Sequence, residues 1–426
     1  MNTFHSNSPS KLLSPAMQLR ESTLMVFCDP VPTEYARLLH RSRKEWKDLL
    51  VWLDTSGLAL YFLDRMEELD LLEMLPRTVL SRLRQNLADN KERINAMIAE
   101  SVKIQHRFQE AGLIYAVLKG FSLWPISVPK LELRSQLDLD FLVAEENAMD
   151  ARQILEDTGY RLKAIAGESG RSWEFVSSEY CESSLKSLYK SGMRRSADLH
   201  IEKVGAGQSS RLSRTHKLLF RGFNMPVLSP VDYFLGQGLH VYQHVCCEFL
   251  RAAHLIEFRR HVIARYGDHA FWNKLKQQVA GDSATCVRLG MVTLLISRVM
   301  GRFAPEALTS WTVDHLPATA SLWVNIYGFR TALASFPGSK LYLLLQEEMK
   351  PMGLAVKRSR MKALLPYRSP SSIMHPVTGE TVSVRMKRYR KQIHFLFFRL
   401  RFHALEGIRY LRESILWRQY RNGLPQ

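Results

Sequence analysis

The stretch LRSQLDLDFLV, residues 133–143, alternates apolar and polar positions in steps of two. Apolar side chains occupy positions 137, 139, 141 and 143, and Asp138 and Asp140 lie between the first three. In a β-strand this period places both carboxylates on one face of the sheet, about 6.6 Å apart along the chain at ~3.3 Å per residue. Like charges on one face repel each other, and Asp is a poor strand former. The pattern therefore predicts a strand whose acidic face is compensated by a cation.

Other strand-like segments surround this one between residues 111 and 204. LIYAVL follows Gly112, and RLKAI, SWEFVS and SADLHIE follow further on, each of strand length. Residues 145–157 have helical spacing instead and end before Gly159. We expect a mixed sheet with helices on one side.

The sequence on both sides of this block has the periodicity of helices. Apolar residues fall close to a 3.6-residue stripe at Leu83, Leu87, Ile94, Ile98, Val102 and Phe108. The fold class we expect is α+β, with a mixed-sheet core flanked by N- and C-terminal helical regions. The expected parts are a mobile Ser/Pro/Asn-rich segment at 1–22, a helical region at 23–110, the α/β core at 111–204, a helical region at 205–350, and a basic hairpin and amphipathic helix at 351–426.

The charge balance changes this picture, because 59 Lys and Arg residues face 41 acidic ones, a net charge of +18 over 426 residues. Such an excess favours anionic partners such as nucleotides, nucleic acid or acidic membrane surfaces. It is concentrated between Lys357 and Arg421, where 16 basic residues stand against three Glu.

Targeting and redox signals are weak. The five cysteines include the adjacent pair Cys246 and Cys247 and have no metal-ligand spacing, so we interpret them as small buried hydrophobic residues in a reducing compartment. The N-terminus has no apolar signal-peptide core, and no uncharged run reaches the length of a membrane span. A cytoplasmic protein without a transmembrane segment is expected.

A third carboxylate in SADLHIE suggests chemistry for the acidic face. Asp198 alternates with Ala197 and Leu199, so this strand also has one apolar and one polar face. If it lies beside the Asp138 strand, three carboxylates converge, and uncompensated they would raise one another's pKa values. Two divalent cations ~3.5–4 Å apart would neutralise them and form a two-metal site for phosphoryl or nucleotidyl transfer.

Upstream, a turn offers groups that hold phosphate. Lys119, Gly120 and Ser122 follow a strand end, where glycine permits close approach of backbone N–H groups and the Lys and hydroxyl add donors. Arg134 is a further candidate for phosphate charge. A Lys at a strand end is otherwise most often simply solvated.

A strand, a Gly/Ser turn, D-x-D on the next strand and an Asp on a later strand resemble the DNA polymerase beta-type nucleotidyltransferase superfamily. LKG followed by R-x-x-x-D-L-D-F-L-V and D-L-H is similar to a family of bacterial proteins known as uncharacterised nucleotidyltransferases. The similarity covers mainly residues 112–204, and it is weaker in LHVYQH and FLRAAHLIEF. The chain departs from the pattern where Phe121 separates Gly120 from Ser122, and where His254 occupies a position that relatives often give to Asp.

The resemblance implies a metal-dependent nucleotidyltransferase that moves a nucleoside monophosphate from a nucleoside triphosphate, ATP among the candidates, to a hydroxyl of a small molecule or protein. Templated polymerisation is less favoured, because no template-binding module is recognisable. The expected catalytic and metal-binding residues, with Mg²⁺ or Mn²⁺ as cofactor, are Asp138, Asp140 and Asp198, and the expected nucleotide-binding residues are Lys119, Gly120, Ser122 and Arg134. Replacing Asp138 or Asp140 by Asn should abolish transfer and leave the metal-free protein at least as stable, because repulsion is relieved.

An alternative is a non-catalytic adaptor on a degenerate nucleotidyltransferase fold, which binds nucleic acid or an anionic membrane surface through its C-terminal helix. The apolar stripe of that helix, at residues 385–420, comprises Ile393, Leu396, Leu400, Ala404, Ile408, Leu411 and Ile415. Basic residues gather off the stripe, at Arg388, Lys391, Arg399, Arg409 and Arg412. Packing of the stripe on the protein core is slightly favoured, and the basic face stays open.

Three histidines have weaker interpretations. For His200 we favour a structural hydrogen bond over a ligand role. His240 and His244 are four residues apart, on one face of a helix, which is a metal-compatible spacing, but without the Glu of H-E-x-x-H it does not support a zinc hydrolase. Core or hinge positions are favoured for both.

Overall fold

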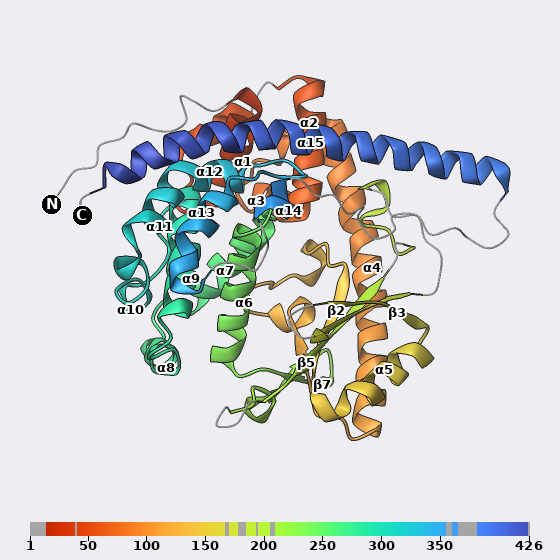
Figure 1. The fold of residues 1–426 in the computed structure, drawn as a ribbon. Coiled ribbons are helices and arrows are strands. Elements are labelled where there is room, and N and C mark those ends of the chain that lie inside the picture. Colours follow the sequence, from red (N-terminus) through yellow and green to blue (C-terminus); the bar gives the residue numbers. More distant parts are fainter. Residues whose placement is uncertain are drawn as a thin grey trace.

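The computed structural model describes residues 14–38, 41–166, 170–177, 185–192, 195–204, 209–354, 360–364 and 381–424. A seven-stranded mixed sheet with the order β3-β4-β5-β2-β1-β7-β6 forms one part of the protein (Figure 1). Strand β2 runs parallel to β5, and β1 parallel to β7, while the other neighbours are antiparallel. The strands are β1 Tyr115–Leu118, β2 Asp138–Ala144, β3 Tyr160–Ala166, β4 Ser172–Ser177, β5 Ser196–Glu202, β6 His216–Phe220 and β7 Phe223–Val227.

Helices make up most of the remaining described residues, and the expected α+β class is confirmed. Those before and within the sheet are α1 Pro15–Met25, α2 Arg43–Ser56, α3 Ala59–Glu68, α4 Arg77–Glu110 and α5 Ala148–Asp157. Those after it are α6 Pro230–Val245, α7 Ala252–Ala264, α8 His269–Gln278, α9 Ser283–Met300, α10 Glu306–Thr309, α11 Ala318–Trp323, α12 Phe329–Ala332, α13 Tyr342–Met349, α14 Arg360–Leu364 and α15 Val382–Asn422.

Helix α4 connects the helical part to the sheet. Its predicted stripe is confirmed: Leu83 is buried in the hydrophobic cluster of the helical part, and Ile94 and Phe108 are buried in the cluster beneath the sheet. The apolar positions of β2, such as Phe141, join that second cluster together with α5. One face of the sheet is therefore covered by α4 and α5, and the opposite face, which carries the aspartates, turns toward α6 (Figure 1).

The ends of two predicted regions differ from the structure. Residues 15–22, expected to be mobile from their composition, belong to α1, whose Leu19 and Ser22 are buried. Residues 1–13 and the candidate hairpin around Thr378-Gly379 lie outside the described residues. The region 205–350, expected to be helical, begins with β6 and β7, because β7 pairs with β1 and extends the sheet. Composition and local periodicity do not register such contacts with distant segments.

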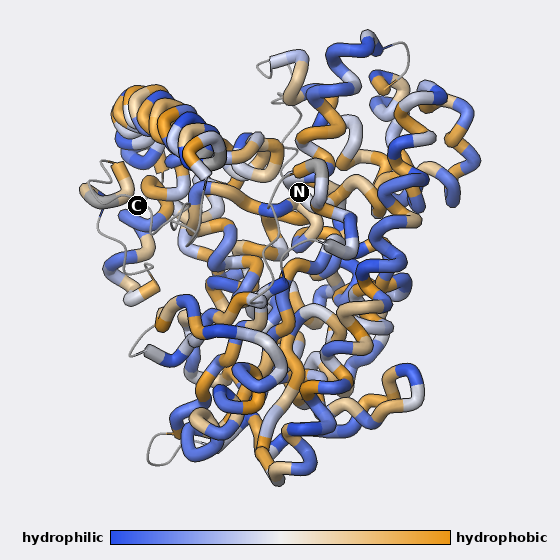
Figure 2. The backbone as a smooth tube through the Cα atoms, turned by 90° about the vertical axis from the view of Figure 1, so that its right-hand side faces the viewer, coloured by the Kyte–Doolittle hydropathy of each residue, from blue (hydrophilic) through white to orange (hydrophobic). Residues whose placement is uncertain are grey.

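Helix α15 packs by a different face from the one that its sequence predicted. The buried residues are Phe402, Glu406, Tyr410 and Trp417, which are spaced by one or two turns. The predicted apolar stripe lies on the opposite side and is exposed to solvent, at Ile393, Leu396, Leu400, Ala404, Ile408, Leu411 and Ile415. Figure 2 shows α15 nearly end-on at the edge of the molecule, with hydrophobic and hydrophilic segments alternating along it. The expectation that this stripe packs on the core was wrong.

Helix α9 is the one described helix that is long and apolar enough to cross a membrane. More than half of it, 56%, is buried inside the protein, and core helices of soluble proteins pass the same test. Its length and composition are therefore weak evidence for a membrane span.

Candidate active site

The parallel pairing of β2 with β5 brings the predicted acidic residues to one face of the sheet. Asp140 lies directly opposite Asp198, and Asp138 opposite Ser196. His200 follows Asp198 by two positions and therefore shares its face. On the other side of β2, Leu118 at the end of β1 pairs with Asp140, so the turn that follows β1 starts beside this carboxylate.

A tight group forms from Asp140, Asp198 and His200. Each offers one ligand atom, and these atoms lie within 4.8 Å of one another. His200 Nε2 is 3.1 Å from Asp140 Oδ1, and Asp140 is only 3% exposed. Two of the three predicted metal ligands thus come together, and the structural hydrogen bond expected for His200 is present. Asp138 does not join this group, although its charge acts on Asp198.

The two central carboxylates have opposite electrostatic environments. Burial, then the charges of Asp140 and Asp138, raise the pKa of Asp198 to about 6. Burial would also raise the pKa of Asp140, but Lys119 and His200 outweigh it and hold this pKa below its usual value. Asp198 is therefore the carboxylate that can change protonation near neutral pH.

Lys119 is the cation that the strand pattern required. Its Nζ is 2.9 Å from Asp140 Oδ1, and its side chain remains 33% exposed. Burial opposes the charge on Lys119, but the Asp140 carboxylate outweighs burial and raises the pKa of the ammonium. The ion pair keeps Lys119 charged at the edge of the group.

The turn after β1 is built around an unusual backbone. Lys119 and Gly120 both have φ +43°, and a Cβ at Gly120 would collide with the side chain of Gln136. Ser122 is 6% exposed, and its hydroxyl donates to the Lys119 carbonyl at 2.8 Å. The Ser122 hydroxyl therefore stabilises the turn itself.

Arg134, a candidate phosphate-binding residue in the sequence analysis, is mostly buried. Its side chain is 13% exposed, and its Nε donates to Glu257 Oε1 of α7 at 3.0 Å. The same carboxylate oxygen accepts from the Tyr61 hydroxyl at 3.0 Å. Nearby, Arg251 Nη2 donates to Ser135 Oγ at 3.1 Å. Burial and the Asp140 charge raise the pKa of Asp138, and the positive charges of Lys119, Arg134 and Arg251 oppose this rise only in part. The sequence analysis did not identify Arg251, whose contact depends on the packing of α7.

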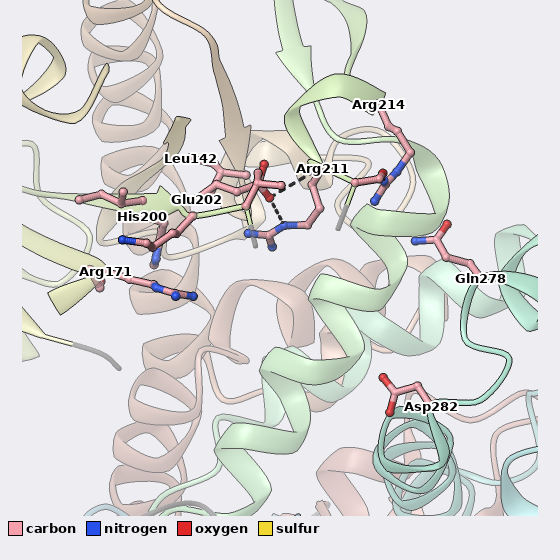
Figure 3. A pocket seen from close by; sticks show the side chains of 13 residues that line it. Leu142, Arg171, His200, Glu202, Arg211, Arg214, Gln278 and Asp282 are labelled. Carbon is pink, nitrogen blue, oxygen red and sulfur yellow. Dashed lines mark hydrogen bonds and ion pairs between the residues drawn. The ribbon is translucent and has the colours of Figure 1, made fainter. Parts of the chain in front are cut away.

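A cavity of about 850 Å³ opens beside His200, between the end of β5 and the start of α9 (Figure 3). Its lining is mainly basic and includes Arg171, Lys203, Arg211 and Arg214, with the carboxylates of Glu202 and Asp282. Arg211 Nε is 2.7 Å from Glu202 Oε1. The volume lies in the usual range for small-molecule sites, and the charge favours an anionic ligand.

Residues 42–295 match the family model described as "Uncharacterised nucleotidyltransferase". The chain belongs to this family. The match begins at α2, includes the whole sheet and ends within α9, so it extends well beyond the segment from which the resemblance was inferred. No curated protein matches the sequence. Helix α15 lies outside the family match.

Proposed function

We propose that the protein transfers a nucleoside monophosphate from a nucleoside triphosphate to a hydroxyl group of a small molecule or protein, with Mg²⁺ or Mn²⁺. The observation that carries this proposal is the group of Asp140, Asp198 and His200 beside a basic cavity, in a chain of a nucleotidyltransferase family. The donor set fits such a cation, because Mg²⁺ and Mn²⁺ prefer carboxylate oxygens.

In the proposed reaction Asp140 and Asp198 hold the metal, Asp138 contributes negative charge at the start of β2, and His200 orients the Asp140 carboxylate. A bound divalent cation would neutralise charge on the phosphates and lower the pKa of the acceptor hydroxyl. Lys119 is exposed enough to reach a phosphate, Gly120 and Ser122 form the turn that directly follows it, and Arg134 adds positive charge near Asp138.

The acceptor oxygen forms a bond to the α-phosphorus, the bond from that phosphorus to the β-phosphate oxygen breaks, and pyrophosphate leaves. The acceptor proton passes to solvent, because a bound cation would lower the pKa of the acceptor hydroxyl. The protein contributes mainly positioning and charge neutralisation.

Mass spectrometry tests this proposal directly. The protein is incubated with a cell extract, each nucleoside triphosphate in turn, and Mg²⁺ or Mn²⁺, and products are searched for a nucleoside monophosphate adduct. Asp198→Asn should abolish the adduct, while Asp150→Asn, on an exposed position of α5, should leave it unchanged. An adduct that forms equally with Asp198→Asn would contradict the proposed site.

A second function is favoured by the exposed face of α15. We infer that this helix docks on anionic membrane surfaces. Large apolar side chains are exposed along its outer face, among them Phe397 at 67%, Leu400 at 67% and Ile408 at 66%. Between residues 381 and 405 the chain has seven Lys and Arg and no acidic residue. An apolar face next to basic residues is typical of helices that lie in the interface of an acidic bilayer, whereas two such basic helices would repel each other.

Vesicle co-sedimentation tests whether the exposed face of α15 binds anionic membranes or a nucleic acid. Binding should be strong on vesicles with phosphatidylserine, weak on phosphatidylcholine alone, and reduced by salt. Leu400→Asp should lose binding, and Leu219→Asp, exposed on β6, should keep it. Nucleic-acid binding that is unaffected by Leu400→Asp, without binding to vesicles, would show that the partner is a nucleic acid instead.

A further inference from the structure

Three histidines converge on a second cluster, which the proposed transfer reaction does not use. His240 and His244 lie one turn apart on α6, and His254 lies in the first turn of α7. The ring centroids are 4.6 Å apart for His240 and His244, 4.6 Å for His244 and His254, and 5.0 Å for His240 and His254. One ring nitrogen of each lies within 4.8 Å of the others. Packing of α6 against α7 therefore creates a three-nitrogen site that the spacing on α6 alone did not reveal.

The histidine cluster contains a buried polar atom without a partner. His254 is 7% exposed, and its Nδ1 has no hydrogen-bond partner in the structure. A buried imidazole nitrogen that makes no hydrogen bond is costly, and such groups in folded proteins call for a ligand, an ion or a water. His244 is held from outside the cluster, since the Phe249 backbone carbonyl is a hydrogen-bond partner of its ring. A backbone carbonyl that fixes one ring nitrogen of a histidine is the usual outer contact of a metal ligand.

Electrostatics keep the three imidazoles neutral. Burial is the main cause, and neighbouring positive groups add to it, so the pKa falls to about 2 for His240, to about 4 for His244 and well below the usual value for His254. Neutral imidazoles supply lone pairs but no positive charge, which suits a metal ion better than an anion.

We propose that His240, His244 and His254 bind a transition-metal ion of the Zn²⁺ type, at a site separate from the Asp140–Asp198 carboxylates. Zn–N bonds of about 2.0–2.1 Å would require the three nitrogens, which lie within 4.8 Å of one another, to approach more closely. Three protein nitrogens leave a fourth coordination position for water or a substrate oxygen. The two sites sort metals by ligand type, because imidazole suits Zn²⁺ and related ions whereas carboxylates suit Mg²⁺ and Mn²⁺.

The charged groups around the histidine cluster affect how tightly it can bind a metal ion. Lys119, Arg134 and Arg251 place positive charge near the cluster, and Asp140 places negative charge near His240. The nearby cations oppose a dication, so we expect weaker binding than at an isolated three-histidine site. The influence of Lys119 and Asp140 on His240 also indicates that a metal bound there would lie close to the proposed phosphate-binding turn.

Titration of the full-length, EDTA-treated protein with Co²⁺ tests the proposal without any nucleotide, so its outcome is independent of the transfer reaction. Four-coordinate Co²⁺ absorbs visible light strongly, and we expect one equivalent to produce this absorption and Zn²⁺ to abolish it. His254→Ala should weaken binding at least about tenfold. His240→Asn, at a partly exposed position, should do the same with less risk to folding, which circular dichroism checks.

Two control variants complete the experiment. Asp198→Asn removes a carboxylate of the other site and should keep the Co²⁺ absorption, and His216→Ala, exposed on β6, should behave as wild type. Wild-type protein without the absorption, or unchanged affinity in folded His240→Asn and His254→Ala, would overturn the proposal. Loss of the absorption in Asp198→Asn with retention in His254→Ala would do so too, because it would assign the metal to the carboxylates.

Discussion

Asp140 and Asp198 face each other across neighbouring strands, but their environments differ. Asp140 is ion-paired with Lys119 and hydrogen-bonded to His200, which stabilise its charge. Asp198 has burial and two neighbouring carboxylates acting against its charge. Replacement of each by Asn should therefore change stability in opposite directions, which corrects the expectation that removal of Asp140 relieves repulsion.

Asp198→Asn should stabilise the metal-free protein at neutral pH. The pKa of Asp198 is 3.8 in the unfolded chain and is raised to about 6 in the folded protein. Between these two pH values the folded protein binds more protons than the unfolded chain, so wild-type stability falls as pH rises through this window. The variant lacks this loss and should unfold at a temperature roughly 1–3 °C higher at pH 7.5, with no difference near pH 4. Thermal melts in EDTA across this range measure the effect, and a lower melting temperature at pH 7.5 would contradict it.

Asp140→Asn should destabilise the same metal-free protein by roughly 1–3 kcal/mol, because Lys119 and His200 lose the partner of their charge and hydrogen bond. The pKa of Asp140 is lowered, so its contribution is present above the unfolded value and is lost as pH falls toward the folded value. The deficit should therefore shrink in acid. Urea unfolding at pH 7.5 and at a pH about one unit below the unfolded value of 3.8 gives both numbers, and equal stability at pH 7.5 would mean that the ion pair contributes nothing.

At the scale of elements, α15 has two faces that both carry apolar residues. Trp417 is buried, and its Nε1 donates to Glu348 at 3.0 Å, while Glu413 pairs with Arg330 at 3.4 Å. These contacts with the preceding helices select the packed face. The richer apolar stripe is left outside, where the inferred membrane contact would use it.

Trp417→Ala should cost about 3–5 kcal/mol of unfolding free energy, because a large buried side chain and its hydrogen bond are lost. Ile415→Ala, two residues away on the exposed face, is the matched control and should change stability by less than about 0.5 kcal/mol. Denaturant unfolding of the full chain compares them. Equal losses would mean that both faces pack.

At the scale of the molecule, helix α4 connects the sheet to the helical part of the protein. Buried polar contacts between the sheet and helix α7 add a second connection. Arg134 precedes β2, and its partner Glu257 lies on α7. Arg251, just before α7, reaches Ser135. These links hold the acidic face of the sheet at a defined distance from the helices that carry the histidine cluster.

Arg134→Met should destabilise the protein by about 3–5 kcal/mol, because Glu257 would keep a buried charge without its cation. The control Arg107→Met breaks the exposed pair with Asp157 and should cost no more than about 1 kcal/mol. Urea unfolding measures both. A small loss in Arg134→Met would instead indicate that the ion pair with Glu257 contributes little to stability, and that Arg134 is available for phosphate.

The sequence by itself determined those strands and helices whose apolar side chains recur at a regular period and form one buried face. The alternation around Asp138 and Asp140 and around Asp198 predicted two strands, and the stripe from Leu83 to Phe108 predicted α4, because period and apolar burial act locally. It also predicted that a cation accompanies the acidic pair, since like charges on one face repel.

Only the tertiary structure decided what depends on contacts between distant segments. These include the pairing that places Asp140 opposite Asp198, the packing that buries α1 and selects the Trp417 face of α15, and the addition of β6 and β7 to the sheet. They also include His200 in the carboxylate group and His254 beside His240 and His244. No periodicity encodes these choices, because each is made by the free energy of burying one surface against another that lies far away in the chain.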